Sequence, residues 1–142
     1  MSKSNQWEGD VLKLYFNGVG ASNLCTSSGS TTIYVRLYTS DPLEAGSSAN
    51  EVQYTPYAAA TVTRSTAGWA FTSVDNGPST VNPANNIDFA TPTSTGQPVV
   101  THFGVSRAAS GVVDYSGTVS PPITITAGLV PRLTTASVIT ED

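Results

Sequence analysis

Hydrophobic and polar residues alternate over residues 33–39, and this alternation is the clearest structural signal in the chain. The odd positions carry Ile, Val, Leu and Thr, whereas the even positions carry Tyr, Arg and Tyr. A period of two with β-branched and aromatic side chains predicts a half-buried strand. Asp41-Pro42 ends it, because proline has no N–H to donate to a neighbouring strand. A loop follows over residues 43–50, and a second strand is predicted from Tyr57 to Arg64.

Similar short patterns recur along the rest of the chain, separated by turn residues about every ten positions. Further strands are predicted over 68–74, 87–90, 99–107, 112–119, 123–126 and 132–140. Residues 75–86 are predicted to form a loop, and Pro121-Pro122 is predicted to separate two strands. Gly104 and Gly117 mark expected bulges or places of close backbone approach. About seven or eight short antiparallel strands predict an all-β fold, a β-sandwich in preference to a partly open barrel.

Residues 5–17 form the one predicted helix. Trp7, Val11, Leu14 and Tyr15 recur at helical spacing, and Gly18 is suited to end the helix. The favoured interpretation is that this apolar stripe packs on the protein's own sheet. The alternative is that it docks on a neighbouring subunit, which makes Trp7 and Leu14 candidate interface residues.

The length of 142 residues suggests a single domain over 1–142, with the helix at 5–17 and the sandwich at 32–140. Charged residues make up only 11% of the chain, well below the usual fraction of about 25%. The chain is instead rich in Ser, Thr, Gly and Asn. This composition fits a β-domain with a surface of hydroxyl and amide groups better than it fits a disordered chain.

Charge and hydropathy argue against two classes of partner. The formal net charge is −4, and the six Lys and Arg residues are scattered, whereas nucleic-acid binders gather basic residues on one face. No stretch approaches the roughly 20 apolar residues of a membrane helix, and the N-terminus does not read as a secretory signal. We therefore expect no nucleic acid and no membrane as partners, and folding in a cytoplasm.

The candidate chemistry is sparse. His102 is the only histidine and Cys25 the only cysteine, and neither has a partner for catalysis nearby in sequence. Asp41, Glu44 and Glu51 share one loop and are suited in principle to a hard cation, but solvated loop carboxylates are the favoured interpretation. We predict no enzyme activity, no catalytic residue, no metal and no cofactor.

The aromatic residues suggest contact surfaces. Tyr34, Arg36 and Tyr38 share the second face of the first strand, and an exposed Tyr–Arg–Tyr face is typical of protein interfaces. The alternative is that this face lies under the N-terminal helix and that the aromatic residues belong to the core. Tyr54 and Tyr57 in the following segment complete the candidate interface. The same aromatics, together with Trp69, would also suit stacking on sugars, so a carbohydrate-binding module for host adsorption is the alternative function.

Several sequence segments carry a resemblance to a known family. They include Leu37-Tyr-Thr-Ser-Asp-Pro42, Tyr54-Thr-Pro-Tyr-Ala58, Val100-Thr-His-Phe-Gly-Val105 and Pro131-Arg-Leu-Thr-Thr135. In their order and spacing they resemble a family of small tailed-bacteriophage proteins commonly labelled tail fibre proteins.

The resemblance implies a structural protein of the virion, assembled in the host cytoplasm. Its partners would be capsid or tail subunits, itself, and in the alternative a host glycan. Both a tail or tail-fibre position and a capsid decoration role are compatible with the chain at this stage.

Overall fold

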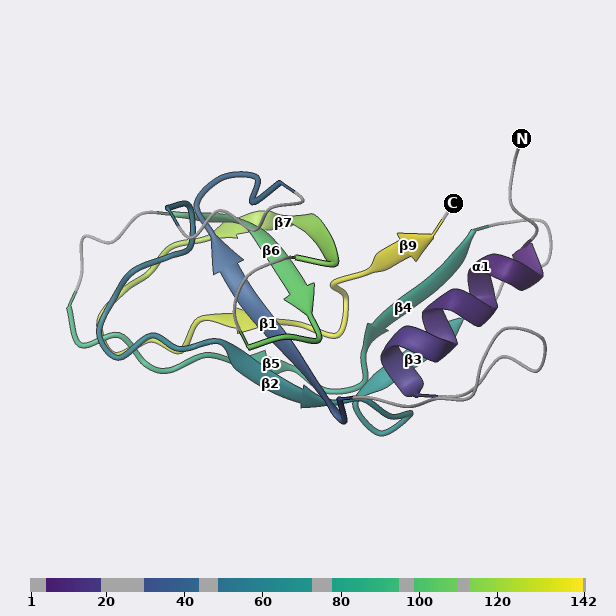
Figure 1. Cartoon of the computed structure of the whole chain (residues 1–142). Coiled ribbons are helices and arrows are strands. Elements are labelled where there is room, and N and C mark those ends of the chain that lie inside the picture. The colour runs from purple at the N-terminus through teal and green to yellow at the C-terminus, as the bar shows by residue number, and fades with distance from the viewer. Residues whose placement is uncertain are drawn as a thin grey trace. The chain divides into compact units, whose positions relative to one another are not determined.

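The computed structural model describes residues 5–18, 30–43, 49–72, 78–94, 99–109 and 113–141 (Figure 1). These residues form antiparallel sheets with one short helix, so the predicted all-β fold with an N-terminal helix is confirmed. The chain divides into two compact units. Unit 1 comprises Met1–Thr32, Thr63–Asn86 and Thr134–Asp142, and unit 2 comprises Ile33–Val62 and Ile87–Leu133. The single domain over 1–142 stays a prediction, and each unit is described by itself.

Unit 2 is built on a four-stranded sheet. Its strands, in spatial order, are β2 (Ala60–Thr63), β1 (Thr32–Tyr38), β6 (Val100–Ser106) and β7 (Tyr115–Ile123). β1 pairs with β6 from Tyr34 opposite Ser106 to Tyr38 opposite His102. The short strands β5 (Ile87–Asp88) and β8 (Arg132–Leu133) form a separate antiparallel pair.

Both faces of β1 are buried. Ile33, Val35 and Leu37 on one face are at most 1% exposed, and on the other face Tyr38 is equally buried. On the first face the Phe103 ring lies over Gly117, where an added Cβ would come within 2.8 Å of it. On the second face a Cβ at Gly104 would come within 2.9 Å of Val113. Side chains thus approach both glycines closely, whereas the register irregularity of the β6–β7 pair lies between Val100 and His102.

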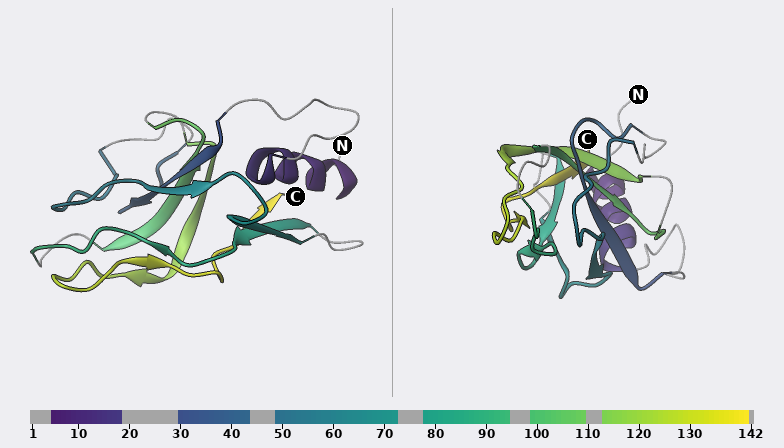
Figure 2. Two further views of the ribbon diagram at one scale, coloured as in Figure 1. Left: turned by 90° about the horizontal axis from the view of Figure 1, so that it is seen from below. Right: turned by 90° about the vertical axis from the view of Figure 1, so that its left-hand side faces the viewer.

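Unit 1 contains the helix and a three-stranded sheet. The helix α1 (Asn5–Leu12) continues into one π-helical turn, η1 (Lys13–Asn17), and Gly18 ends it at a φ of 67°. The sheet has the order β3 (Trp69–Thr72), β4 (Ser79–Pro83) and β9 (Ile139–Glu141). The helix packs on this sheet, as the favoured interpretation predicts (Figure 2). The Phe16 and Trp69 rings lie 4.7 Å apart, and Gly9 allows the approach of Phe71.

The buried stripe of the helix differs from the prediction. Leu12 and Phe16 are completely buried and Tyr15 nearly so, whereas Val11 and Leu14 are only half-buried. The side chain of Trp7 lies outside the described residues. The difference has a geometric cause. A π-turn takes more residues per turn than an α-turn, so the residues that face inward no longer follow the spacing expected of an α-helix.

Three strand predictions are wrong in detail. β4 lies where a loop over 75–86 was predicted, because Ser79 and Val81 alternate with half-buried neighbours in a pattern too short to detect. β7 runs through Pro121-Pro122, which is tolerated because β7 is an edge strand. The predicted strand 132–140 is two strands, β8 and β9, which belong to different sheets.

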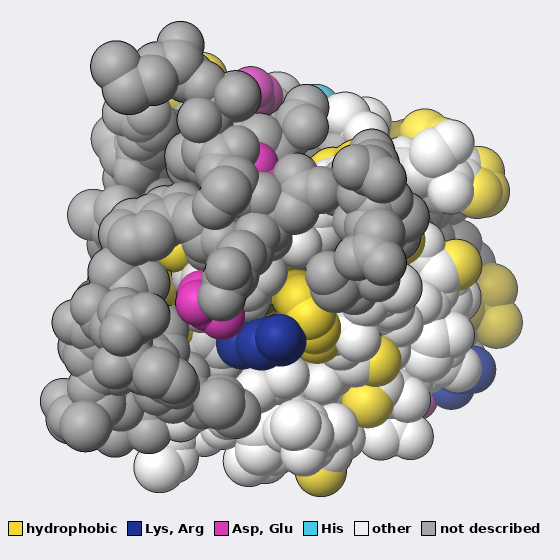
Figure 3. Space-filling model, turned by 90° about the vertical axis from the view of Figure 1, so that its right-hand side faces the viewer, with side chains coloured by type: hydrophobic (Ala, Val, Ile, Leu, Met, Phe, Trp, Pro, Cys, Tyr) yellow, Lys and Arg dark blue, Asp and Glu magenta, His cyan; other side chains and the backbone are white. Residues whose placement is uncertain are grey.

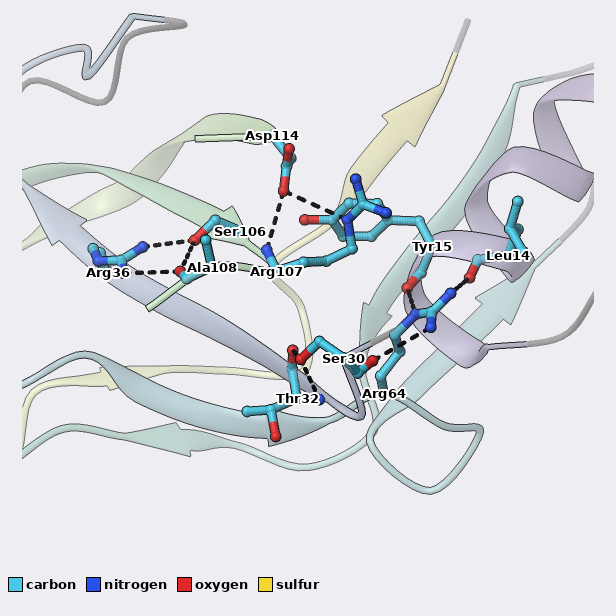
Figure 4. A network of polar contacts seen from close by, with 10 residues as sticks. All are labelled: Leu14, Tyr15, Ser30, Thr32, Arg36, Arg64, Ser106, Arg107, Ala108 and Asp114. Carbon is cyan, nitrogen blue, oxygen red and sulfur yellow. Dashed lines mark hydrogen bonds and ion pairs between the residues drawn. The ribbon is translucent and has the colours of Figure 1, made fainter. Parts of the chain in front are cut away.

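A single arginine closes the end of the helix. The Arg64 guanidinium donates to the carbonyl oxygens of Leu14 and Tyr15 in the last turn and to that of Ser30, at 3.3 Å (Figure 4). The last carbonyls of a helix have no partner within it and carry partial negative charge. Arg64 therefore stabilises the helix end both by hydrogen bonding and by charge.

We predict that Arg64→Ala lowers the free energy of unfolding by about 1.5–3 kcal/mol, the usual range for hydrogen bonds to a charged group. Urea unfolding followed by tryptophan fluorescence measures this loss in the unit that contains Arg64, since Trp7 and Trp69 both belong to unit 1. Arg107→Ala is the matched control, because that side chain is 55% exposed and its loss should cost less. Equal losses for the two variants would contradict the assignment.

The exposed pair Asp88–Arg132 links β5 and β8 through two hydrogen bonds, which lower the pKa of Asp88 below its ordinary value of 3.8. Because the pKa of Asp88 is lowered in the folded state, the pair stabilises the protein at pH values above the pKa that Asp88 has in the unfolded chain. That contribution disappears as the pH falls through the folded value. We predict that Asp88→Asn shifts the urea midpoint at neutral pH, and that this shift disappears as the pH falls through the lowered pKa of Asp88. A shift that does not vary with pH would contradict it.

Candidate interaction surface

The most extensive polar network in unit 2 surrounds Arg36, whose side chain is 5% exposed. It donates to Ser106 Oγ at 2.7 Å, to the Ala108 carbonyl at 3.2 Å and to the Ala109 carbonyl (Figure 4). Its Nε lies 3.8 Å from Oε1 of Glu51. A buried charge is tolerated only when it is paired and hydrogen-bonded. These contacts pair and hydrogen-bond the guanidinium within unit 2.

The segment after β6 covers this second face of the sheet. The Asp114 carboxylate accepts a hydrogen bond from the Arg107 backbone at 3.1 Å, and the Asp114 backbone donates to the Val105 carbonyl at 2.9 Å. Val113 is brought onto Gly104 and Tyr38. The described residues of the connection between β6 and β7, 107–109 and 113–114, therefore lie against the face that carries Arg36 and Tyr38.

Tyr57 joins three parts of unit 2 through one hydroxyl group. Its Oη donates to Glu51 Oε1 at 3.1 Å and accepts from the Leu37 backbone N–H at 3.0 Å. Its ring stacks on Phe89 at 6.3 Å and meets Tyr54 edge-on at 5.2 Å. Burial raises the pKa of Tyr57 well above its ordinary value of 10.0, so the hydroxyl keeps its proton and remains a donor.

The predicted interface residues occupy different environments. The prediction that Tyr34, Arg36 and Tyr38 form an exposed face is wrong for the latter two, which are 4% and 1% exposed. Period-two alternation separates the two faces of a strand but does not reveal that a loop covers the second one. Tyr54 is 9% exposed and donates to the Ala90 carbonyl. Three of the predicted residues are half-buried: Leu14, Tyr34 and Tyr57. The side chain of Trp7 is outside the described residues.

Four large apolar side chains are exposed at one end of unit 2. They are Leu43, Val99, Leu129 and Val130, with exposed fractions of 65%, 44%, 63% and 46%. The segments that carry them belong to neighbouring loops. Thr93 donates to the Thr55 carbonyl, Gly128 donates to the Pro92 carbonyl, and Thr101 donates to the Thr39 carbonyl. We call this end of unit 2, formed by described residues of 39–43, 49–57, 90–99 and 124–131, the loop end (Figures 1 and 2).

Leu43 is held in an unusual backbone conformation at the loop end. Its φ is 56°, a region that non-glycine residues rarely occupy. The Asp41 carboxylate fixes it by accepting a hydrogen bond from the Leu43 backbone at 2.9 Å. Strained conformations of this kind concentrate at functional positions. No signal in the sequence singled out Leu43, because a lone leucine in a loop has no periodic pattern.

The remaining candidate chemistry is engaged in local contacts. Nδ1 of His102 lies 2.9 Å from the Thr101 hydroxyl, while Glu51 faces Tyr57 and Arg36. Cys25 and Glu44 lie outside the described residues. In the part of the chain that the structure describes, no group of His, Cys, Asp and Glu is arranged to hold a metal ion. The same part contains no helix with the length and apolar character needed to span a membrane.

Charged side chains form no large patch of one sign on the face shown in Figure 3 among the residues coloured there. One basic and one acidic group lie side by side next to a hydrophobic cluster. The coloured residues of this face thus show no basic stripe of the kind by which proteins bind nucleic acid.

We predict that Tyr57→Phe lowers the free energy of unfolding by about 1–3 kcal/mol, because the ring stays in place while the Leu37 N–H and Glu51 lose their partner. Denaturant unfolding measures the loss. Tyr34→Phe is the matched control, since this tyrosine on β1 is half-buried and removal of its hydroxyl should leave stability unchanged. A Tyr57→Phe variant as stable as the control would show that the hydroxyl contributes nothing.

Comparisons with known proteins identify one family. No curated protein matches the chain significantly. The family model described as podophage GP4 fiber I protein gp80 matches residues 2–141, which is nearly the whole sequence. The resemblance to tail fibre proteins noted from the sequence is confirmed by this match. The chain therefore belongs to the podophage GP4 fiber I protein gp80 family, a family of phage fibre structural proteins.

Proposed function

We propose that this chain is a non-enzymatic structural component of the tail-fibre apparatus, and that its loop end binds a neighbouring virion protein. The observation that carries the proposal is the exposure of Leu43, Val99, Leu129 and Val130 at one end of unit 2. Large exposed apolar side chains on neighbouring loops are suited to an interaction site, because their burial against a partner is favourable. Leu43 adds to this, since its strained backbone is fixed before any partner arrives.

The polar residues of unit 2 support a structural function in preference to catalysis. Arg36, Glu51 and Tyr57 satisfy one another and the main chain. A catalytic group needs a reacting atom within hydrogen-bond reach of an accessible side chain, whereas these groups bond to one another and to the main chain. Assembly in the host cytoplasm followed by incorporation into the particle is part of the proposal.

Two alternatives receive less support. Membership of a fibre family favours a tail-fibre position over capsid decoration. Carbohydrate binding by the predicted aromatics would need exposed rings, whereas Trp69, Tyr38 and Tyr54 are at most 9% exposed. Tyr34 and Tyr57 are half-buried. Rings in the core have no face on which a sugar can stack.

The test is incorporation into particles. Phage that lack the gene are complemented with wild-type protein, with Leu43→Asp or with Leu129→Asp, and purified heads and tails are analysed by quantitative mass spectrometry. We expect the wild-type chain in the tail fraction and a large loss of both variants, because a carboxylate at an apolar contact must be desolvated.

Val138→Asp is the matched control, since Val138 is a 52%-exposed apolar residue of unit 1 and should leave incorporation unchanged. All three purified variants should retain the wild-type circular dichroism spectrum. Normal incorporation of both leucine variants would refute the loop end as the contact. Recovery of the wild-type chain with heads would instead place it on the capsid, and its absence from all particle fractions would refute a virion function.

A further inference from the structure

Three buried polar atoms of unit 1 have no hydrogen-bond partner among the residues that the structure describes. They are Oδ1 of Asn17, Oγ of Ser65 and Nε1 of Trp69. A polar atom that is removed from water without a partner lowers stability, so nearly all such atoms in folded proteins bond to the protein or to an ordered water. Three of them in one compact unit therefore indicate a bound polar ligand.

The end of the helix lies against the segment that carries the other two atoms. The rings of Phe16 and Trp69 are 4.7 Å apart, and a Cβ at Gly18 would lie 3.4 Å from the Arg64 carbonyl oxygen. Asn17 stands between Phe16 and Gly18 in the sequence. Its neighbours on both sides thus contact residues 64–69.

The turn before β3 holds Ser65 and Trp69 close together. The backbone N–H groups of Gly68 and Trp69 both donate to the Ser65 carbonyl at 3.0 Å. Arg64, directly before Ser65, donates to the carbonyls in the last turn of the helix (Figure 4). The turn is therefore fixed both to the start of β3 and to the helix end.

We propose that one water molecule is bound between the helix end and β3, held by Asn17, Ser65 and Trp69. The indole N–H can only donate, the amide oxygen can only accept, and the hydroxyl can do both. The water accepts from Trp69, donates to Asn17 and makes its third hydrogen bond with Ser65. A buried water usually makes about three hydrogen bonds, which is the number that these side chains offer.

The chemistry of the three atoms favours water over an ion. A cation would face the N–H of Trp69, and an anion would face the amide oxygen of Asn17, so an ion of either sign meets one group of the wrong polarity. The Trp69 side chain is 1% exposed, which requires a small ligand. All three residues belong to unit 1, so the proposal is independent of the loop end and its partner.

The first test is a crystal structure of the full-length protein at a resolution that shows ordered water. We expect one water within hydrogen-bond distance of Asn17 Oδ1, Ser65 Oγ and Trp69 Nε1. A direct hydrogen bond from Trp69 Nε1 to a protein group would overturn the proposal, and so would the lack of an ordered water within reach of that nitrogen.

The second test detects the water in solution by NMR, through the nuclear Overhauser effect between water protons and the indole N–H proton of Trp69. A water that stays bound while the protein tumbles gives a cross-peak of the same sign as those within the protein, unlike surface hydration. The variant Trp7→Phe assigns the signal, because the chain has two tryptophans. We expect this cross-peak in the wild type, and its absence would overturn the proposal.

The variant Ser65→Ala excludes a signal relayed by the serine hydroxyl proton. It leaves Asn17 and Trp69 as partners, and two partners are enough to hold a buried water. The cross-peak should therefore persist. Its loss in this variant would show that the hydroxyl carried the signal, which would overturn the proposal.

The double variant Asn17→Leu/Ser65→Ala removes two of the three partners and should abolish the cross-peak. Thr66→Ala is the matched control, since it removes an exposed hydroxyl from the same turn and should leave the cross-peak unchanged. Circular dichroism spectra equal to that of the wild type show that the variants fold. A cross-peak of wild-type intensity in the double variant would overturn the proposal.

Discussion

Unit 2 depends on a guanidinium group that has been removed from water. Arg36 lies in the middle of β1 and holds the end of β6 and the segment after it by hydrogen bonds to Ser106, Ala108 and Ala109. A planar group with five donors can serve several acceptors at once, and removal of its partners would leave a buried charge at high cost. In unit 1, Arg64 likewise donates hydrogen bonds to the main-chain carbonyls at the helix end. In a chain with few charged residues, two of the six basic side chains thus bind main-chain carbonyls.

Much of the fold could be predicted because it is encoded locally. Alternation identified β1 and β6, and Gly18 marked the end of the helix, since each depends on residues close together in sequence. The π-turn, β4 and the passage of β7 through two prolines could not be predicted. Their stability comes from packing, from strand pairing and from the position of a strand at a sheet edge, and these properties depend on residues distant in sequence.

The candidate site was harder to predict than the fold. Aromatic and arginine residues are enriched both at interfaces and in interiors, and composition alone does not separate the two. Arg36 and Tyr38 were assigned to the outside for this reason, although the connection after β6 buries them. The exposed apolar residues of the loop end come from three separate segments of the sequence, so only the folded chain brings these segments to one end of unit 2.

The order of the segments along the chain determines when each sheet can form during synthesis. The four-stranded sheet of unit 2 is complete once Ile123 is available. The sheet of unit 1 needs β9, which ends at Glu141, although its helix begins at Asn5. Unit 1 therefore joins the first and last described elements of the chain, and such non-local pairing is slow to form. A ribosome must synthesise the chain at least as far as Glu141 before a finished sheet can cover the apolar face of the helix, and until then that face is available to chaperones.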